Sequence, residues 1–253
     1  MKTVFITGAA SGIGLATARR FAAEGWIVGL YDLNEEQIEE HLKSPEFGQA
    51  CGGRCDVTSH DSVAQALQHF AGKTQGRMDV LINNAGVLTP GHFEEIDHKA
   101  HDLMIDVNIC GLTHVAQQAF PWLRDTPEST LLNLCSVSSA HGVPLLAVYS
   151  ASKFYVNGLT QALSIEWAEH GIRVLSIKPP FVATAMLDDM PAQLMKTFTV
   201  DFNPEQIADS ILSAIAGSRY SYLVGWKAKM LGALSKYLPS SMSRWIVKKV
   251  TGY

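Results

Sequence analysis

A tyrosine and a lysine stand four positions apart in the segment AVYSASKFYVNG, residues 147–158. On a helix, residues i and i+4 lie on one face about one turn apart, so Tyr149 and Lys153 would be neighbours. A tyrosine normally releases its proton at about pH 10, which is too alkaline for acid–base catalysis at neutral pH. An ammonium about 4 to 6 Å away, at an effective dielectric constant of about 20, would stabilise the phenolate by about 3 to 4 kcal/mol. The pair therefore predicts a tyrosine whose pKa is lowered for proton transfer.

The residues between this pair, Ser150, Ala151 and Ser152, are small. Small side chains would let a cofactor and a substrate lie against the helix without obstruction. A tyrosine and a lysine at this spacing also occur by chance in many helices, so the chemical interpretation depends on the elements around them.

Strand and helix patterns alternate along the chain. Apolar, β-rich runs predict strands at residues 2–7, 26–32, 52–57, 78–86, 129–136, 172–179 and 221–225. Helical patterns occupy residues 15–25, 34–43, 59–73, 97–124, 204–217 and the segment that carries Tyr149. Strands that alternate with helices favour right-handed crossovers and a parallel sheet covered on both faces. The sequence therefore predicts an α/β fold, one doubly wound parallel sheet of the Rossmann type, as a single domain over residues 1–253.

A glycine-rich turn, GAASGIG, joins the first predicted strand to the first predicted helix. Glycines let the backbone approach a pyrophosphate, and a helix N-terminus offers free N–H groups with a partial positive charge. The position of Gly8, Gly12 and Gly14 favours a dinucleotide site over the alternative, in which these glycines only form a tight turn.

Asp32 ends the second predicted strand, 18 residues after Gly14. A carboxylate there can accept hydrogen bonds from both hydroxyls of an adenosine ribose, and it would repel a 2′-phosphate. Neither Ser11 nor a neighbour of Asp32 supplies a positive charge to hold such a phosphate. The sequence predicts NAD rather than NADP as the cofactor; the alternative is a solvated aspartate at a strand end.

Several motifs occur together: TGAASGIG at the start, NNAG at residues 83–86, VNICG around Asn108, a serine 13 residues before Tyr149, and YSASK. In this order and at this spacing they resemble the short-chain dehydrogenase/reductase family, over residues 3 to about 184. The resemblance implies an NAD-dependent oxidoreductase that transfers a hydride between the nicotinamide and a secondary alcohol or ketone.

The resemblance also implies a role for each of four residues. Tyr149 would be the general acid in carbonyl reduction and the base in alcohol oxidation, and Ser136 would hold the substrate oxygen and stabilise its developing charge. Lys153 would lower the tyrosine pKa and bind the nicotinamide ribose. Asn108 would position a water that relays protons from Lys153 to solvent.

Two alternatives remain open within this set. Ser138 and Ser139 compete with Ser136, although the spacing to the tyrosine favours Ser136. Taken alone, Asn108 is equally consistent with a structural hydrogen bond inside a helix.

The cofactor site implied by the resemblance extends beyond the glycine turn. Asp56 would lie beside the adenine, while Asn84 and Gly86 would shape the wall under the adenosine ribose. Thr184 would reach the nicotinamide carboxamide or the pyrophosphate. The full predicted set is Gly8, Ser11, Gly12, Ile13, Gly14, Asp32, Asp56, Val57, Asn84, Ala85, Gly86, Tyr149, Lys153, Pro179, Val182 and Thr184.

One departure from the family pattern lies in this set. The chain has Pro179-Pro180 where family members usually have Pro-Gly. Proline fixes φ, lacks an N–H and restricts the residue before it. The loop is expected to be stiffer or shifted, which weakens the predictions for Val182 and Thr184.

Residues 185–202 occupy the position of the family's mobile substrate lid, and they are rich in methionine, leucine and phenylalanine. Methionines adapt to irregular apolar shapes, so a lipophilic substrate, steroid-like or long-chain, is favoured over a sugar. The alternative is that these side chains only pack the lid onto the body. His141 and His92 could line the pocket mouth or be ordinary loop histidines. The predicted substrate contacts are Ser136, His141, Tyr149, Met186 and Met190.

Residues 226–253 form a basic tail. The 24 acidic residues all lie at or before Asp209 with 13 basic ones, a balance of about −11, whereas the rest of the chain holds seven Lys and Arg and no acid. After Ser241 a predicted helix places apolar residues on one face (Met242, Trp245, Ile246, Val250) and basic residues away from it (Arg244, Lys248, Lys249). Such a helix could lie on an anionic membrane surface or pack on its own or a neighbouring acidic subunit.

The bulk composition fits one compact globular domain, with 47% hydrophobic and 17% charged residues among 253. The four cysteines lack metal-site spacing and are too sparse for a disulfide framework, so no metal is predicted and a reducing cytosol is favoured. The N-terminus does not read as a secretion signal, and no apolar run approaches the roughly 20 residues of a membrane span. A cytoplasmic location, or one peripheral to a membrane, is expected.

Two other function classes fit the sequence less well than an oxidoreductase. A dinucleotide-binding sensor or scaffold that has lost its chemistry would not need the intact set of Asn108, Ser136, Tyr149 and Lys153. Nucleic-acid binding through the tail lacks a reader motif and is opposed by the acidic body. A reductase of a 3-oxoacyl-type substrate is a further alternative. The resemblance also implies a homodimer or homotetramer built from the helices near residues 97–124 and 149–170.

Overall fold

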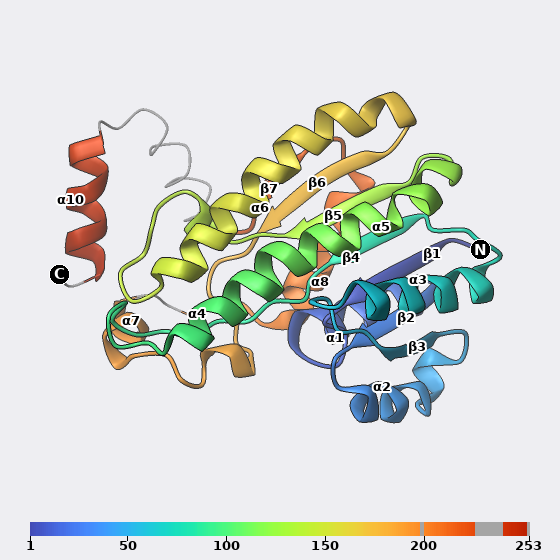
Figure 1. Cartoon of the computed structure of the whole chain (residues 1–253), viewed down its shortest axis with the longest axis horizontal. Helices are drawn as coiled ribbons and strands as arrows, with labels where there is room; N and C mark the ends of the chain where they lie inside the picture. The colour runs from blue at the N-terminus through green and yellow to red at the C-terminus, as the bar shows by residue number, and fades with distance from the viewer. Residues whose placement is uncertain (198–199, 226–239, 252–253) are drawn as a thin grey trace.

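The computed structural model describes residues 1–197, 200–225 and 240–251 of the chain (Figure 1). Its centre is one parallel sheet of seven strands in the order β3-β2-β1-β4-β5-β6-β7. The strands are β1 (Thr3–Thr7), β2 (Ile27–Asp32), β3 (Cys51–Arg54), β4 (Val80–Asn83), β5 (Thr130–Leu134), β6 (Arg173–Lys178) and β7 (Ser221–Leu223). The strand order reverses between β1 and β4, and ligands of such sheets bind outside the carboxyl ends at that point. The predicted doubly wound α/β fold is confirmed.

Helices connect the strands and cover both faces of the sheet. They are α1 (Gly12–Ala23), α2 (Glu35–Leu42), α3 (His60–Thr74), α4 (His98–Ile105), α5 (Leu112–Asp125), α6 (Ala147–Glu166), α7 (Ala192–Thr197), α8 (Pro204–Ala216) and α10 (Ser240–Thr251). Short turns of helix are η1 (Pro45–Phe47), η3 (Val137–Ser139), η4 (Trp167–His170) and η5 (Ala185–Leu187), and η2 (Asp106–Gly111) is a π-helix.

Two apolar cores lie on opposite faces of the sheet because the side chains of each strand alternate between faces. On β1, Val4 and Ile6 pack with residues of α1, α2 and α8, whereas Phe5 packs with residues of α3 and α5. All three side chains are fully buried. All five residues of β1 are therefore buried, as expected of a central parallel strand covered on both faces.

The boundaries follow local chemistry. Asn34 caps α2 by accepting a hydrogen bond from the Gln37 N–H, and Asn203 forms a capping box with Gln206 at the start of α8. Residues 97–124, predicted as one helical stretch, divide into α4, the π-helical turn and α5. The π-helical turn carries Asn108, so the irregular backbone coincides with a predicted site residue.

The lid helix α7 and the C-terminal helix α10 lie on one side of the molecule. Figure 1 shows α7 and α10 at the end toward which the β6 arrow points, and α10 contacts α7. Residues 226–239, the first part of the predicted tail, lie outside the described residues. No helix within the described ranges is long and apolar enough to cross a membrane.

Candidate active site

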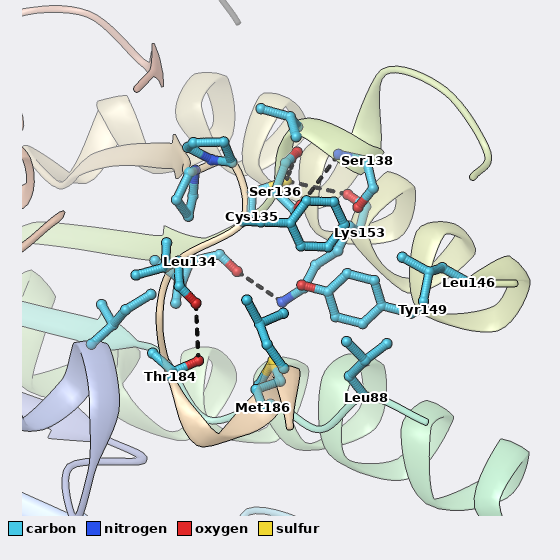
Figure 2. Close-up of a pocket in the computed structure, with 18 of the residues that line it drawn as sticks. Leu88, Leu134, Cys135, Ser136, Ser138, Leu146, Tyr149, Lys153, Thr184 and Met186 are labelled. Atoms are coloured by element: carbon cyan, nitrogen blue, oxygen red, sulfur yellow. Dashed lines mark hydrogen bonds between the residues drawn. The ribbon is translucent and has the colours of Figure 1, made fainter. Parts of the chain in front are cut away.

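Three of the four predicted catalytic residues, Ser136, Tyr149 and Lys153, meet in one pocket of about 480 Å³ at the carboxyl ends of the strands. Tyr149 and Lys153 come from the first two turns of α6, and Ser136 comes from the end of β5. In Figure 2 these side chains point into the same part of the pocket, and Lys153 Nζ lies 5.4 Å from the centroid of the Tyr149 ring. The i, i+4 argument thus places the ammonium beside the phenol.

Ser136 is the serine that bonds the phenol, since its side chain and that of Tyr149 are hydrogen-bonded. The Ser138 N–H donates to Ser136 Oγ at 3.2 Å, and Ser139 Oγ donates to the Ser136 carbonyl at 2.7 Å. Ser138 Oγ is buried without a hydrogen-bond partner among the described residues. The two competing serines therefore support Ser136 rather than replace it.

Lys153 is a buried cation, with only 4% of its surface exposed. Its Nζ donates a hydrogen bond of 3.1 Å to the carbonyl oxygen of Leu134, the last residue of β5 (Figure 2). Removal from water lowers the pKa of Lys153, because burial disfavours the charged form. One carbonyl bond thus fixes the amine at the floor of the pocket.

The pKa of Tyr149 differs from the sequence-based expectation. Burial raises it to about 12, the hydrogen bond with Ser136 acts in the opposite direction, and the neighbouring Cys135 adds to the rise. Desolvation outweighs the attraction of the ammonium because the phenolate would have to form among apolar side chains. In the protein alone, Tyr149 is therefore held in its protonated form, ready to donate.

The small residues between Tyr149 and Lys153 do not serve the purpose predicted for them. Ser150 and Ser152 are buried away from the pocket rather than lining it. Ser150 Oγ accepts a hydrogen bond from the Val143 N–H, and Ser152 Oγ donates to the Tyr149 carbonyl. Their hydroxyls fix the start of α6 instead of leaving space beside it.

Asn108 is buried, and its side-chain amide holds the backbone that follows β4. Its Oδ1 accepts from the Val87 N–H and its Nδ2 donates to the Val87 carbonyl, each at 2.8 Å. A second contact of Nδ2 reaches Ser152 Oγ at 3.3 Å. Asn108 does not line the pocket, and its side chain ties β4 to α6; the water relay implied by the resemblance stays a prediction.

The glycine turn lies at the opposite end of the same pocket. A Cβ on Gly14 would lie 2.0 Å from the Gly8 carbonyl oxygen, and one on Gly8 would lie 2.8 Å from the Ala85 Cα. Gly8 and Gly12 also have positive φ, of 65° and 53°. Ser11 precedes α1, whose first turn carries no acidic residue, so the partial positive charge of its N-terminus is not opposed there.

Asp32 lines the pocket at the end of β2 with its carboxylate oriented by backbone. Its Oδ2 accepts from the Ala10 N–H and its Oδ1 from the Asn34 N–H, both at 3.0 Å. None of the ion pairs formed within the described ranges involves this carboxylate. Each oxygen keeps a lone pair for a further donor, such as a ribose hydroxyl.

The NNAG segment joins the two ends of the pocket. Asn84 Nδ2 donates to the carbonyls of Thr7 and Gly8, at 2.9 Å each, and so braces the glycine turn. A Cβ on Gly86 would lie 3.2 Å from Asn108 Oδ1 and 3.8 Å from Lys153 Nζ. Of the predicted cofactor residues, Gly14, Asp56 and Val57 are not among those that line the pocket.

The double proline does not remove the loop after β6 from the site. Pro179, Val182 and Thr184 all line the pocket. The Thr184 methyl lies 3.3 Å from the position that a Cβ on Gly12 would take. The Ala183 N–H donates a hydrogen bond of 2.9 Å to the Phe202 carbonyl, which ties this loop to the residues just before α8.

The substrate side is apolar. His141 and Met186 line the pocket as predicted, whereas Met190 and His92 do not. Met190 is instead buried with Leu194 in a cluster that includes the Tyr149 ring, so the lid packs onto the body. Pocket residues without a sequence signal are Leu88, Val143, Leu146 and Phe181.

The C-terminal helix α10 also reaches this pocket, which Ile246 and Val247 help to line. Both are partly buried, whereas Met242 and Trp245 are exposed, by 46% and 59%. Of the apolar face predicted for this helix, Ile246 turns toward the pocket together with Val247, whereas Met242 and Trp245 are open to water. The Val250 side chain lies outside the described residues.

The chain is similar to a known family and to several known proteins. A family model described as short chain dehydrogenase matches residues 2–194. The chain is 32% identical over 232 residues to the 3-oxoacyl-[acyl-carrier-protein] reductase FabG of Thermotoga maritima, covering 88% of this chain and 94% of that protein. It is 34% identical over 230 residues to the meso-2,3-butanediol dehydrogenase of Serratia marcescens, covering 88% and 90%.

Two solved structures share the fold. The 3-ketoacyl-(acyl-carrier-protein) reductase of Brucella melitensis, complexed with NADH, superposes with a TM-score of 0.79 at 28% identity, covering 88% of this chain and 96% of that one. A short chain dehydrogenase/reductase of Burkholderia phymatum in complex with NAD gives 0.84 at 24% identity, with 92% of each chain covered.

Proposed function

Because the chain belongs to the short-chain dehydrogenase family and is an oxidoreductase, we propose that it transfers a hydride between a nicotinamide cofactor and a secondary alcohol or ketone, with Tyr149 as the general acid and base. The observation that carries this proposal is the single pocket in which Ser136, Tyr149 and Lys153 meet the glycine turn and Asp32.

We propose NAD as the cofactor. Asp32 is held by backbone N–H groups and has no cationic partner in the described ion pairs, so it would accept the ribose hydroxyls and repel a 2′-phosphate. The closely packed glycines before α1 leave its N-terminus open to a pyrophosphate. When bound, the nicotinamide supplies or accepts the hydride.

The chain's own residues would handle the proton. Tyr149, protonated in the protein alone, donates its proton to a carbonyl oxygen, or as the phenolate accepts the proton of an alcohol. Ser136 Oγ holds that oxygen and stabilises the charge that develops on it. Lys153, fixed by Leu134, favours the phenolate whenever the tyrosine gives up its proton.

A lipophilic substrate fits the pocket best. The side chains around the phenol on the substrate side, Leu88, Val143, Leu146, Phe181, Met186 and Leu187, are apolar. Apolar walls select hydrocarbon and exclude a polyhydroxylated sugar, whose hydroxyl groups would be buried without partners. A steroid-like or long-chain alcohol or ketone is the substrate class we propose.

A 3-oxoacyl-type substrate is the second candidate. It is supported by the similarity to two proteins named as 3-oxoacyl or 3-ketoacyl reductases. Both candidates need the same Tyr149 chemistry and differ in what the pocket mouth must admit. A catalytically silent sensor is less consistent with a hydrogen-bonded Ser136–Tyr149 pair next to a buried ammonium.

The test is reduction of NAD, followed by absorbance, across secondary alcohols of rising size, with 3-oxoacyl thioesters and NADH assayed in parallel. We expect activity that rises with apolar size and falls by about 10²-fold or more in Tyr149→Phe. Equal rates in the wild type and the phenylalanine variant would contradict the proposed chemistry, and thioester reduction alone would favour the second candidate.

We propose a homodimer or homotetramer built on the helical residues 97–124 and 149–170, the second of which includes most of α6. The exposed side of α6 carries Ala151, Tyr155, Gly158, Ala162 and Ile165 at helical spacing, and Ile165 is 76% exposed. A large apolar side chain that is open to water in one chain fits an interface between copies. Light scattering of wild type and Ile165→Glu tests this, and the same mass for both, whether monomer or oligomer, would contradict it.

We propose a cytoplasmic protein that contacts anionic membrane through the outer face of α10. Arg244, Trp245, Lys248 and Lys249 are exposed there, and Lys249 Nζ lies 4.9 Å from the centre of the Trp245 ring. Sedimentation with anionic vesicles, with and without residues 239–253, tests the contact. Equal partition of both forms would end this proposal without affecting the catalytic one.

A further inference from the structure

The C-terminal helix α10 has two unlike faces. Ile246 and Val247 are partly buried and line the pocket that contains Tyr149. Ser241, Met242, Arg244, Trp245, Lys248 and Lys249 are exposed. The two pocket residues are adjacent in sequence and lie about 100° apart around the helix. The helix therefore turns one aliphatic edge toward the site.

This aliphatic edge joins an apolar surface made by other parts of the chain. Phe181 follows β6, and Met186 and Leu187 belong to η5, at the start of the lid. α10 also contacts α7, the other helical part of the lid. Lid and C-terminal helix thus bound the same compartment.

The polar groups of the compartment lie elsewhere. Ser136 follows β5, and Tyr149 and Lys153 come from α6. The polar residues of α10 whose side chains the structure describes, which are Ser241, Arg244, Lys248 and Lys249, do not line the pocket. A substrate whose oxygen is held by Ser136 and Tyr149 would therefore present only hydrocarbon to α10. Contact there would contribute binding in proportion to the apolar area removed from water.

We infer that Ile246 and Val247 form a specificity wall, which selects substrates by the length or bulk of the hydrocarbon attached to the reacting carbon. This inference rests on the proposed function and deepens it. The wall gives long-chain or polycyclic alcohols an advantage over short ones, and it is supplied by a helix beyond the region that the family model matches.

The test is the ratio of kcat/KM for methyl nonyl carbinol to that for sec-butanol, both with NAD. Losing the Ile246 side chain removes several methyl and methylene groups from the wall, so Ile246→Ala should lower this ratio by about tenfold. Val247→Trp should lower it at least as much, because the indole fills the space that the chain would occupy. Met242→Ala, an equal loss of apolar bulk on the exposed side of the same helix, should leave the ratio within about twofold of the wild-type value.

Binding of the apolar dye Nile red separates the wall from the chemistry. Its affinity should fall in Ile246→Ala and Val247→Trp but not in Met242→Ala, whether or not the alcohols are oxidised. If the wild type oxidises neither alcohol but dye binding changes as described, the proposed function fails and the wall stands. The inference is overturned if variants with the wild-type circular dichroism and melting temperature show unchanged kcat/KM ratios and unchanged dye affinity. A change only in KM for NAD would overturn it as well.

Discussion

The cofactor-binding half and the substrate-binding half of the pocket differ in how they are built. In the cofactor half, backbone segments pack at close range. Neither Gly8 nor Gly14 has space for a side chain, and Asn84 braces the turn. The substrate half consists of apolar side chains from loops, a lid and α10. Backbone geometry tolerates almost no substitution, whereas an apolar wall can change shape by exchanging one side chain for another. Substitution at the glycine turn should therefore impair dinucleotide binding as a whole, whereas substitution in the apolar wall should change which substrate is preferred.

Gly14→Ala is expected to have the largest effect, because it tests whether the glycine turn of the cofactor half tolerates a side chain. Its Cβ would meet the Gly8 carbonyl at 2.0 Å, and that oxygen cannot retreat because Asn84 holds it. We expect NAD affinity to fall by about 10²-fold or the protein not to fold, measured by calorimetry and circular dichroism. Gly72→Ala in α3 is the control, since nothing lies within 4 Å of the added Cβ, and it should stabilise the protein by about 0.5 to 1 kcal/mol. Normal NAD binding in the Gly14 variant would show that the turn is adjustable.

Lys153→Met, where the two halves of the pocket meet, should lower the catalytic rate without lowering the stability of the protein. We expect kcat to fall by about 10² to 10³-fold, because the cation beside the phenol is lost. The melting temperature should not fall, since a buried ammonium with one carbonyl bond is replaced by an apolar chain of similar length. Scanning calorimetry and steady-state kinetics check both. A clear drop in melting temperature with normal kcat would reverse the assignment.

Asp32→Asn tests which residue of the cofactor half sets the preference for NAD over NADP. Losing the charge should relax repulsion of a 2′-phosphate and lower the preference for NAD over NADP by about tenfold. The shape of the turn should persist, because an amide oxygen can still accept one of the two backbone N–H bonds. The ratio of kcat/KM values for the two cofactors measures the effect. A wild-type preference for NADP would already contradict the role given to Asp32.

The pH dependence should differ between the two directions of reaction. Alcohol oxidation needs the phenolate of a tyrosine whose pKa is raised to about 12, so kcat/KM should rise by up to about tenfold per pH unit toward alkaline pH. Ketone reduction needs the protonated form and should stay level until the pH approaches that pKa. Profiles in both directions check this. An oxidation rate that levels off near neutral pH would contradict the assignment of the base to a tyrosine with this pKa.

Leu194→Ala should have the smallest effect. Leu194 is fully buried in the lid cluster that includes the Tyr149 ring, so its truncation loosens the lid. We expect KM for a long-chain alcohol to rise by about three- to tenfold and KM for NAD to stay unchanged. Initial-rate kinetics with each substrate varied in turn would show this. A rise in KM for NAD would mean that the two halves are not independent.

The contrast between the halves also explains what the sequence could predict. Order, type and approximate bounds of the strands follow from apolar runs and glycine turns, and spacing alone brings Tyr149 beside Lys153. Motifs locate the cofactor half because backbone geometry restricts residue type at Gly8 and Gly14. No such restriction marks Val143, Phe181 or Val247 as pocket residues, because any apolar residue has the same pattern.

Two differences from the sequence-based expectation have physical causes of their own. The tyrosine pKa was expected to fall from a pairwise attraction, whereas burial, which depends on the whole surrounding structure, raises it. The sequence places Ile246 and Trp245 on one apolar face, and the structure separates them, with Ile246 at the pocket and Trp245 exposed, because the covered side of a helix depends on what it packs against.

Transfer of deuterium from the carbinol carbon of a secondary alcohol to NAD, followed by mass spectrometry, tests the central claim most directly. The account predicts that wild-type protein yields NADH carrying the deuterium and that Tyr149→Phe, with unchanged NAD affinity, forms it about 10²-fold or more slowly. NADH without the label, or labelled NADH formed equally fast by the phenylalanine variant, would contradict it.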